Sequence, residues 1–241
     1  MELSRIQPLL DPAILRFLGG GLALTLTVAT AAVILSLLGG TVLAICRLSR
    51  FRPVALAAAG YVEGIRSLPS FLVLIYVYFG AYRMSFDLGT VGSVILGLTV
   101  YHSAKLAEVV RAGIQSIDRG QVEAARSLGL GFMQTMWSVV LPQGFRRMLP
   151  PLVSELVLCI KNTSIGFVVG LNELLRRGTI VYQEYFNPIE TLALIAIVYW
   201  AICFGLSSAA RRLELSGAQR AERASALSSE ALLDRLHARE V

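Results

Sequence analysis

Residues 119–165 carry the most information about the fold: RGQVEAARSLGLGFMQTMWSVVLPQGFRRMLPPLVSELVLCIKNTSI. Glu123-Ala124-Ala125-Arg126 is strongly helix-forming, and Gly129 follows where a helix commonly ends in the left-handed conformation. We therefore expect a short helix here. The second half of the stretch turns apolar and carries Glu155 and Lys161. The stretch thus joins a polar surface helix to an apolar helix that holds two charges.

The composition is typical of a membrane protein. Hydrophobic residues occupy 55% of the 241 positions, charged residues occupy 16%, and the mean hydropathy is +0.66. Soluble domains are about one quarter charged. Residues 17–46 and 191–210 contain no Asp, Glu, Lys or Arg. Because about 20 apolar residues cross the hydrocarbon core of a bilayer as a helix, we expect both segments to be transmembrane helices.

Residues 67–82 and 88–104 are shorter uncharged runs, and a fifth candidate span, residues 148–171, contains Glu155 and Lys161. The predicted fold class is all-α, a polytopic membrane protein with about five transmembrane helices. Residues 1–213 are expected to form one membrane domain, and residues 214–241 a cytoplasmic C-terminal tail to which we assign no function. Three prolines, Pro142, Pro150 and Pro151, are expected to break the chain before the fourth transmembrane helix.

The orientation follows from the basic residues that flank the spans. Arginines gather after the first span, between the third and fourth spans, and after the fifth: Arg47, Arg50, Arg52, Arg111, Arg119, Arg126, Arg146, Arg147, Arg211 and Arg212. The positive-inside rule then places the N-terminus outside and the C-terminus in the cytoplasm. This topology accounts for the net charge of +6, so we expect no nucleic-acid partner.

Residue patterns that would indicate catalysis or metal binding are missing from the sequence. It has no Gly-x4-Gly-Lys-Ser/Thr phosphate loop, and its three cysteines lack metal-ligand spacing. We expect no catalytic residue, no metal and no cofactor of its own. His102, one turn before Lys105, is interpreted as a polar packing group. Active transport by this chain would need energy from a partner or from an ion gradient.

Five motifs follow one another between residues 15 and 213. They are Tyr61-Val62-Glu63-Gly64-Ile65-Arg66-Ser67-Leu68-Pro69, Ala107-Glu108-Val109-Val110-Arg111-Ala112-Gly113-Ile114, residues 120–129 (GQVEAARSLG), Leu141-Pro142-Gln143 and Lys161-Asn162-Thr163-Ser164-Ile165. In order and separation they resemble the motifs of permease subunits of type I ATP-binding cassette (ABC) importers, in the family for polar amino acids such as histidine, glutamine and glutamate. The third motif resembles the EAA loop of those permeases.

This resemblance implies a coupling helix that docks on a separate ATP-hydrolysing subunit, with contacts from Glu123, Ala124, Ala125, Arg126 and Gly129. From the residues alone, the segment reads as an ordinary loop helix. The implied partners are two ATPase subunits, an extracytoplasmic amino-acid-binding protein, a second permease (identical or homologous) and membrane lipids. ATP would be bound by the partner, and the chain itself would not be an enzyme. The implied location is the bacterial cytoplasmic (inner) membrane.

The candidate substrate site rests on charged groups at membrane depth. A charged side chain there costs at least ~2.5–3.5 kcal/mol, so it normally faces protein or water. Glu155 and Asn162 are seven residues apart and share a helical face, whereas Lys161 points away from it. We expect Glu155 to hold the α-ammonium group of a substrate and Asn162 to bond its side group. An alternative is that both residues only tie helices together.

Arg66 and Ser67 are the other candidate substrate-site residues. They precede Leu68-Pro69, where helical hydrogen bonding must be interrupted. Transporters often use such breaks to expose backbone groups to the pathway. Arg66 can also pair with Glu63 on one helical face. An ion pair near the cytoplasmic interface would explain Glu63 and Arg66 without a substrate.

Together these features predict the permease subunit of an ATP-driven importer for polar amino acids, with acidic or amide side chains favoured (glutamate, aspartate or glutamine). The alternative is an ion-coupled secondary amino-acid carrier that uses Glu155 and Lys161. Such carriers are commonly built from duplicated halves, and no clear internal repeat is present here.

Overall fold

A computed structural model describes residues 3–86 and 88–237, with side chains described up to residue 212 apart from residues 3, 4 and 132. Within this part the chain is helical and forms no strand. The elements are α1 Leu3–Ile6, the 3-10 helix η1 Gln7–Leu10, α2 Pro12–Arg47, α3 Arg52–Ser67, α4 Ser70–Arg83, α5 Gly89–Gln115, α6 Arg119–Ser127, α7 Phe132–Thr135, the π-helix η2 Met136–Val140, α8 Leu141–Asn162, the 3-10 helix η3 Thr163–Val169, α9 Leu174–Tyr185 and α10 Pro188–His237.

Four helical runs of the described chain are long and apolar enough to cross a membrane: Pro12–Arg47, Gly89–Gln115, Met133–Val169 and Pro188–Arg212. A fifth span results if α3 and α4, which meet at an angle of 112°, are counted as one broken span. Leu68 and Pro69 are extended at the break, where Pro69 lacks the N–H that would continue α3. The predicted all-α membrane fold with about five transmembrane helices is confirmed.

The predicted chain break before the fourth span is wrong. Pro142 lies in the first turn of α8, directly after the π-helix η2, and the helical run continues through it. Pro150 and Pro151 both lie inside α8, which continues to Asn162. Ser154 donates its hydroxyl hydrogen to the Pro150 carbonyl at 3.2 Å, whereas the carbonyls that the two prolines leave without a helical donor are those of Arg146 and Arg147. The fourth span therefore begins well before residue 148.

The centre of the bundle is the crossing of α2 and α5. A Cβ atom at Gly40 would lie 2.8 Å from Leu106 Cβ and 3.0 Å from the Ala107 nitrogen. Only glycine allows the two backbones to approach this closely. A cluster of buried residues joins α2 and α5 to α4, α8 and the segment after η3: Val28, Ala32, Leu74, Val94, Leu98, Cys159 and Leu171.

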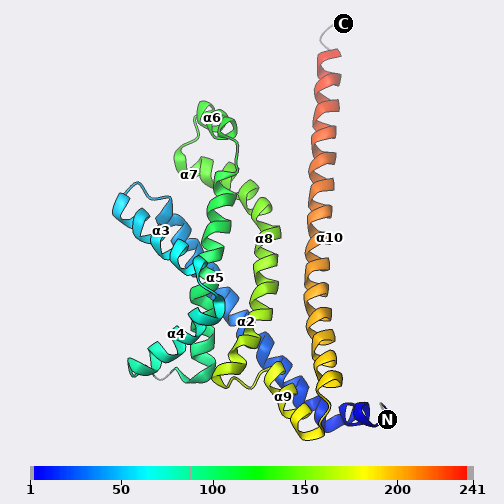
Figure 1. Ribbon diagram of the computed structural model, residues 1–241. Coiled ribbons are helices and arrows are strands. Elements are labelled where there is room, and N and C mark those ends of the chain that lie inside the picture. The colour runs from blue at the N-terminus through cyan, green and yellow to red at the C-terminus, as the bar shows by residue number, and fades with distance from the viewer. Residues whose placement is uncertain (1–2, 87, 238–241) are drawn as a thin grey trace.

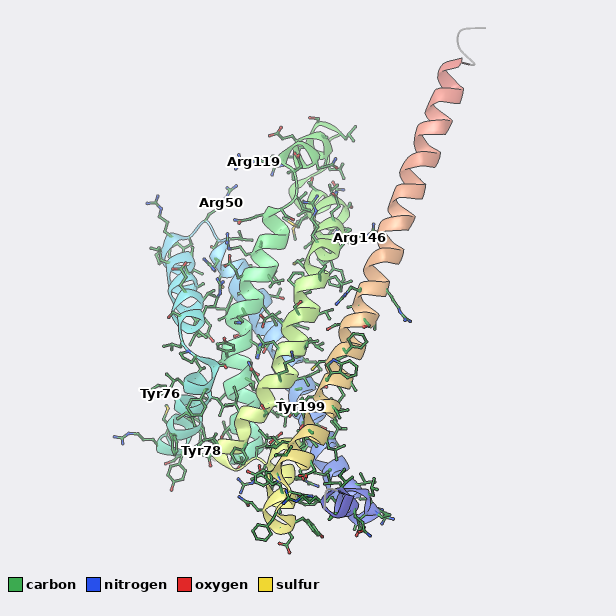
Figure 2. All side chains as sticks on the ribbon, turned by 45° about the vertical axis from the view of Figure 1, so that its right-hand side comes forward. Arg50, Tyr76, Tyr78, Arg119, Arg146 and Tyr199 are labelled. Atoms are coloured by element: carbon green, nitrogen blue, oxygen red, sulfur yellow. The ribbon has the colours of Figure 1, made fainter. Side chains whose placement is uncertain are left out.

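The two ends of the bundle differ in what they carry. Helices α6 and α7 project at one end, whereas the N-terminus, the far end of α4 and α9 lie at the other (Figure 1). Arg50, Arg119 and Arg146 lie toward the end with α6, and Tyr76 and Tyr78 toward the opposite end (Figure 2). Helix α10 continues past residue 213 without interruption, and residues 238–241 lie outside the described part.

Candidate functional site

The short helix α6 is held in place by its two ends. The Asp118 carboxylate accepts a hydrogen bond from the Gly120 N–H at 2.7 Å and so caps the first turn. At the other end Gly129 has φ of +83°, the left-handed conformation expected from the sequence. The Gly129 and Leu130 N–H groups then bond to the Arg126 and Ala125 carbonyls, at 2.9 and 3.2 Å. The helix is therefore a defined unit and not a loose loop.

The exposed surface of α6 is free for a partner. Ala125 is buried, whereas Glu123, Ala124 and Arg126 are exposed. Leu128, just beyond the helix, is 82% exposed. A large apolar side chain beside small and charged residues, at the tip of a projecting loop, has the character of a docking surface.

The structure brings Glu155 and Asn162 together through a third residue, His102. His102 Nδ1 lies 3.0 Å from Glu155 Oε2, and His102 Nε2 lies 3.2 Å from Asn162 Nδ2. His102 comes from α5, whereas Glu155 and Asn162 come from α8, two turns apart. The predicted shared face of Glu155 and Asn162 is therefore the face of α8 that packs on α5.

Burial fixes the role of the imidazole. His102 is 1% exposed, so both ring nitrogens depend on protein partners. With the Asn162 amide nitrogen as donor, His102 Nε2 accepts and Nδ1 donates its hydrogen to Glu155. The imidazole is then neutral and ties the carboxylate to the amide. It holds both groups at fixed positions between the two helices.

Lys105 completes this group, which we call the α5–α8 cluster: Lys105, Glu155, His102 and Asn162. Lys105 Nζ lies 3.6 Å from Glu155 Oε1, and it sits over the Tyr101 ring at 5.2 Å from the centroid. The side chains of Lys105 and Glu155 are 26% and 17% exposed. The carboxylate therefore has histidine on one oxygen and a partly accessible ammonium on the other.

A pocket of about 260 Å³ adjoins the cluster between α2, α5 and α8. His102 and Glu155 are the polar side chains in its wall, and the remainder is apolar: Val33, Leu37, Leu106, Phe145, Leu149, Leu152, Val153, Leu156 and Cys159. A mostly apolar pocket with a few fixed polar groups is the usual form of a small-molecule site.

Arg66 and Ser67 lie at the break between α3 and α4. Arg66 Nη1 is 3.7 Å from Glu108 Oε2, and the Ser67 hydroxyl donates to the Gly64 carbonyl at 2.7 Å. Among the described side chains, neither residue contacts Glu155 or Asn162. The expected Glu63–Arg66 pair is replaced by pairs between helices, because Glu63 bonds to Arg47 at 3.2 Å.

Lys161 lies outside the α5–α8 cluster, as the helical spacing predicts. Its side chain is exposed, and it lies close enough to Cys203 of α10 to act on it electrostatically. Its position one residue before Asn162 turns it about 100° away from the α5 side. Lys161 therefore offers a charge at similar depth that takes no part in the cluster.

The sequence alone indicates a polar packing group at His102 and assigns no role to Lys105, whereas the structure places both beside Glu155. A signal was nevertheless present. Two ionisable residues one turn apart end the uncharged run over residues 88–104, and α8 carries its own ionisable residues at membrane depth. Ionisable groups at this depth in a membrane normally pair with one another.

A second buried carboxylate lies toward the opposite end of the bundle. Glu173 caps α9 by accepting the N–H groups of Leu175 and Arg176, both at 2.8 Å. The Tyr199 hydroxyl of α10 (Figure 2) donates to the same carboxylate at 3.2 Å. Burial raises the pKa of Glu173 above its ordinary value, although these hydrogen bonds oppose the shift. This carboxylate joins α9 to α10.

Residues 36–216 match the family described as "Binding-protein-dependent transport system inner membrane component". The probable glutamine ABC transporter permease protein GlnP of Bacillus subtilis is 39% identical over 206 residues, which cover 83% of this chain and 94% of the relative. The arginine transport system permease protein ArtQ of Bacillus subtilis is 33% identical over 199 residues, 82% of this chain and 91% of the relative.

Among solved structures, one described as the crystal structure of an amino acid ABC transporter with histidines superimposes with a TM-score of 0.79. The two chains are 31% identical, and the match covers 83% of this chain and 94% of the other. Nearly the whole described membrane part of this chain therefore has a counterpart of the same fold.

Proposed function

Since the chain belongs to the family of binding-protein-dependent transport system inner membrane components, and is a multi-pass permease of a polar amino-acid ABC importer, we propose that its cargo is an amino acid with an amide or acidic side chain. The relatives named above are described as glutamine and arginine permeases. Because family membership leaves the cargo open, the argument for an amide or acidic side chain rests on the site.

The observation that carries the proposal is the joining of Glu155 and Asn162 through His102. Glu155 binds the α-ammonium group of the amino acid, since a carboxylate at membrane depth attracts a cation. Asn162 bonds the polar side group. An amide can donate to a carboxylate or carbonyl oxygen and accept from an N–H, but it adds no negative charge to attract a basic side chain. Glutamine, glutamate and aspartate fit this arrangement better than arginine.

Arg66 and Ser67 line the route to this site at the broken helix. The Leu72 and Val73 N–H groups bond to the Pro69 carbonyl, which leaves the N–H groups of Ser70 and Phe71 at the start of α4 available to a passing polar ligand. Helix α4 packs against both α5 and η3, and η3 begins directly after Asn162. Helix α4 thus lies beside the segment that follows Asn162.

Helix α6 transmits the work of a separate ATPase subunit. Glu123, Ala124 and Arg126 form its exposed contact surface, Ala125 anchors it, and Gly129 fixes its end. ATP is bound and hydrolysed in the partner, and alternating access results because ATP and the amino acid each favour one of two membrane states. The arginine-rich end that carries α6 faces the cytoplasm, which puts the N-terminus outside.

The complete importer contains this chain, a second identical or homologous permease, two ATPase subunits and an extracytoplasmic amino-acid-binding protein in the inner membrane. The test is uptake of labelled glutamate by the reconstituted assembly. Uptake should require ATP, and unlabelled glutamine or aspartate should compete strongly while arginine should not. Dominant competition by arginine would refute the assignment of side-chain class.

A parallel measurement separates ATP-driven import from ion-coupled transport. The permease alone, reconstituted with an imposed ion gradient and no ATPase, should accumulate no label. Accumulation under these conditions would establish a secondary carrier instead.

A further inference from the structure

The two contacts of the Glu155 carboxylate differ in kind. Its Oε2 lies 3.0 Å from His102, a hydrogen-bond distance, whereas its Oε1 lies 3.6 Å from the Lys105 ammonium. Charge-assisted N–H···O bonds are about 2.7–2.9 Å long. Lys105 therefore neutralises Glu155 without forming a tight bond, and it can be displaced more easily than His102.

The order of the groups matches the layout of an amino acid. Along the α5–α8 cluster the contacts run from Lys105 to Glu155, then to His102, then to Asn162. An amino acid whose ammonium binds Glu155 and whose side group reaches Asn162 has its α-carboxylate left over. The contact order places Lys105 at the end of Glu155 away from Asn162, where that carboxylate would lie.

Building on the proposed function, we propose that Lys105 is the anchor for the α-carboxylate of the transported amino acid. In the structure the Lys105 ammonium occupies the place of the substrate's ammonium beside Glu155. When the amino acid enters, its ammonium replaces Lys105 on Glu155, and the freed Lys105 binds the carboxylate. The exchange replaces one internal ion pair with two pairs that include the ligand.

Charge balance supports this exchange. The empty site holds one carboxylate and one ammonium beside a neutral imidazole, and a zwitterion adds one charge of each sign. No charge is left unpaired in either state, which matters because an unpaired charge in a poorly hydrated site is costly. Lys105 is 26% exposed, so its long side chain can swing between the two partners, and the Tyr101 ring lies beneath it.

The test measures ligand binding to the permease–ATPase complex in lipid nanodiscs, without the binding protein, whose own selectivity would otherwise enter. The probes are labelled glutamine and its α-carboxamide, which differ only in the carboxylate. The wild-type complex should prefer glutamine by at least about tenfold, the worth of a charge-assisted hydrogen bond. Lys105→Met should bind both compounds about equally, and Lys105→Arg should restore much of the preference.

Lys161→Met is the matched control, because it removes a lysine at similar depth that lies outside the cluster. It should keep the wild-type preference. If the Lys105→Met complex still binds glutamine about tenfold more tightly than the α-carboxamide, the proposed role of Lys105 as the carboxylate anchor is wrong.

Glu155→Gln separates this inference from the one on which it rests. This variant should bind both compounds more weakly, since both carry the α-ammonium group. If Glu155→Gln changes neither affinity, or if the wild-type complex binds neither compound, the proposed site itself fails. If Glu155→Gln weakens both while Lys105→Met leaves the preference intact, only the role of Lys105 fails.

Discussion

Replacing His102 by alanine tests whether the imidazole positions the substrate-binding groups. The substitution removes the donor 3.0 Å from Glu155 and the acceptor 3.2 Å from Asn162. It leaves the backbone of α5 unchanged, because alanine is the strongest helix former. We expect the two α8 side chains to lose their fixed positions while the helices stay in place.

The size of the effect follows from these contacts. A hydrogen bond to a charged group contributes about 1.5–3 kcal/mol. The lower end applies here, because Lys105 still neutralises Glu155 and the carboxylate is 17% exposed. A loss near 1.4 kcal/mol corresponds to about a tenfold weaker affinity for glutamine. The emptied space around a side chain that is 1% exposed also lowers the free energy of unfolding, by about 2 kcal/mol.

The assay is glutamine binding to the permease–ATPase complex, with thermal unfolding measured on the same samples. His102→Asn places an amide nitrogen near the position of Nδ1 and should keep affinity within about threefold of wild type. His102→Gln reaches the position of Nε2 instead and should weaken binding as the alanine variant does. Ser103→Ala is the control, since this buried neighbour bonds to the Val100 carbonyl of its own helix and lies beside Gly39 of α2 and Tyr61 of α3.

Equal losses of stability in all three His102 variants, with no change in glutamine affinity, would refute the positioning role. The imidazole would then be a packing group, as the sequence first suggested.

Three further predictions concern parts of the chain away from the cluster. Glu123→Lys should leave ATP hydrolysis by the assembled importer intact but abolish amino-acid uptake. The control variant Glu184→Lys, at the opposite end of the bundle, should transport normally. Unimpaired uptake by Glu123→Lys would show that α6 is not the coupling element. Gly129→Ala should cost about 1 kcal/mol because of the positive φ and so increase protease cleavage near α6, while Gly131→Ala should not; equal cleavage of both would contradict this. Burial raises the pKa of Glu173, so the folded state keeps this proton to a higher pH than the unfolded chain does. The free energy of unfolding should therefore fall as pH rises above the ordinary carboxyl range. Glu173→Gln should flatten this dependence in thermal melts recorded at several pH values, and an unchanged slope would count against the prediction.

The features predicted well from the sequence are those set by local chemistry. The uncharged runs over residues 17–46 and 191–210 identify two spans because about 20 apolar residues cross the hydrocarbon core as a helix. The break at Pro69 and the left-handed Gly129 follow from what these two residues do to a backbone. The shared face of Glu155 and Asn162 follows from helical geometry alone, and the structure shows which helix that face meets.

The features that could not be predicted depend on contacts between helices. Nothing within α5 shows that His102 lies against α8, and the pairing of Glu63 with Arg47 in place of Arg66 depends on how α3 packs on α2. The chain break predicted at Pro150 and Pro151 is wrong for a related reason. Proline disfavours an isolated helix, but here the surrounding bundle keeps α8 continuous through both residues.

The most direct test of the proposed site is the selectivity of Asn162→Asp. This substitution changes little but the charge at the position assigned to the substrate side group. Glutamate and arginine should be compared as competitors on the wild-type and variant permease–ATPase complexes. We predict that the variant gains affinity for arginine and loses affinity for glutamate, because the new carboxylate attracts a cationic side chain and repels an acidic one. If the order of competitors is unchanged, Asn162 does not face the substrate, and the α5–α8 cluster only holds the bundle together.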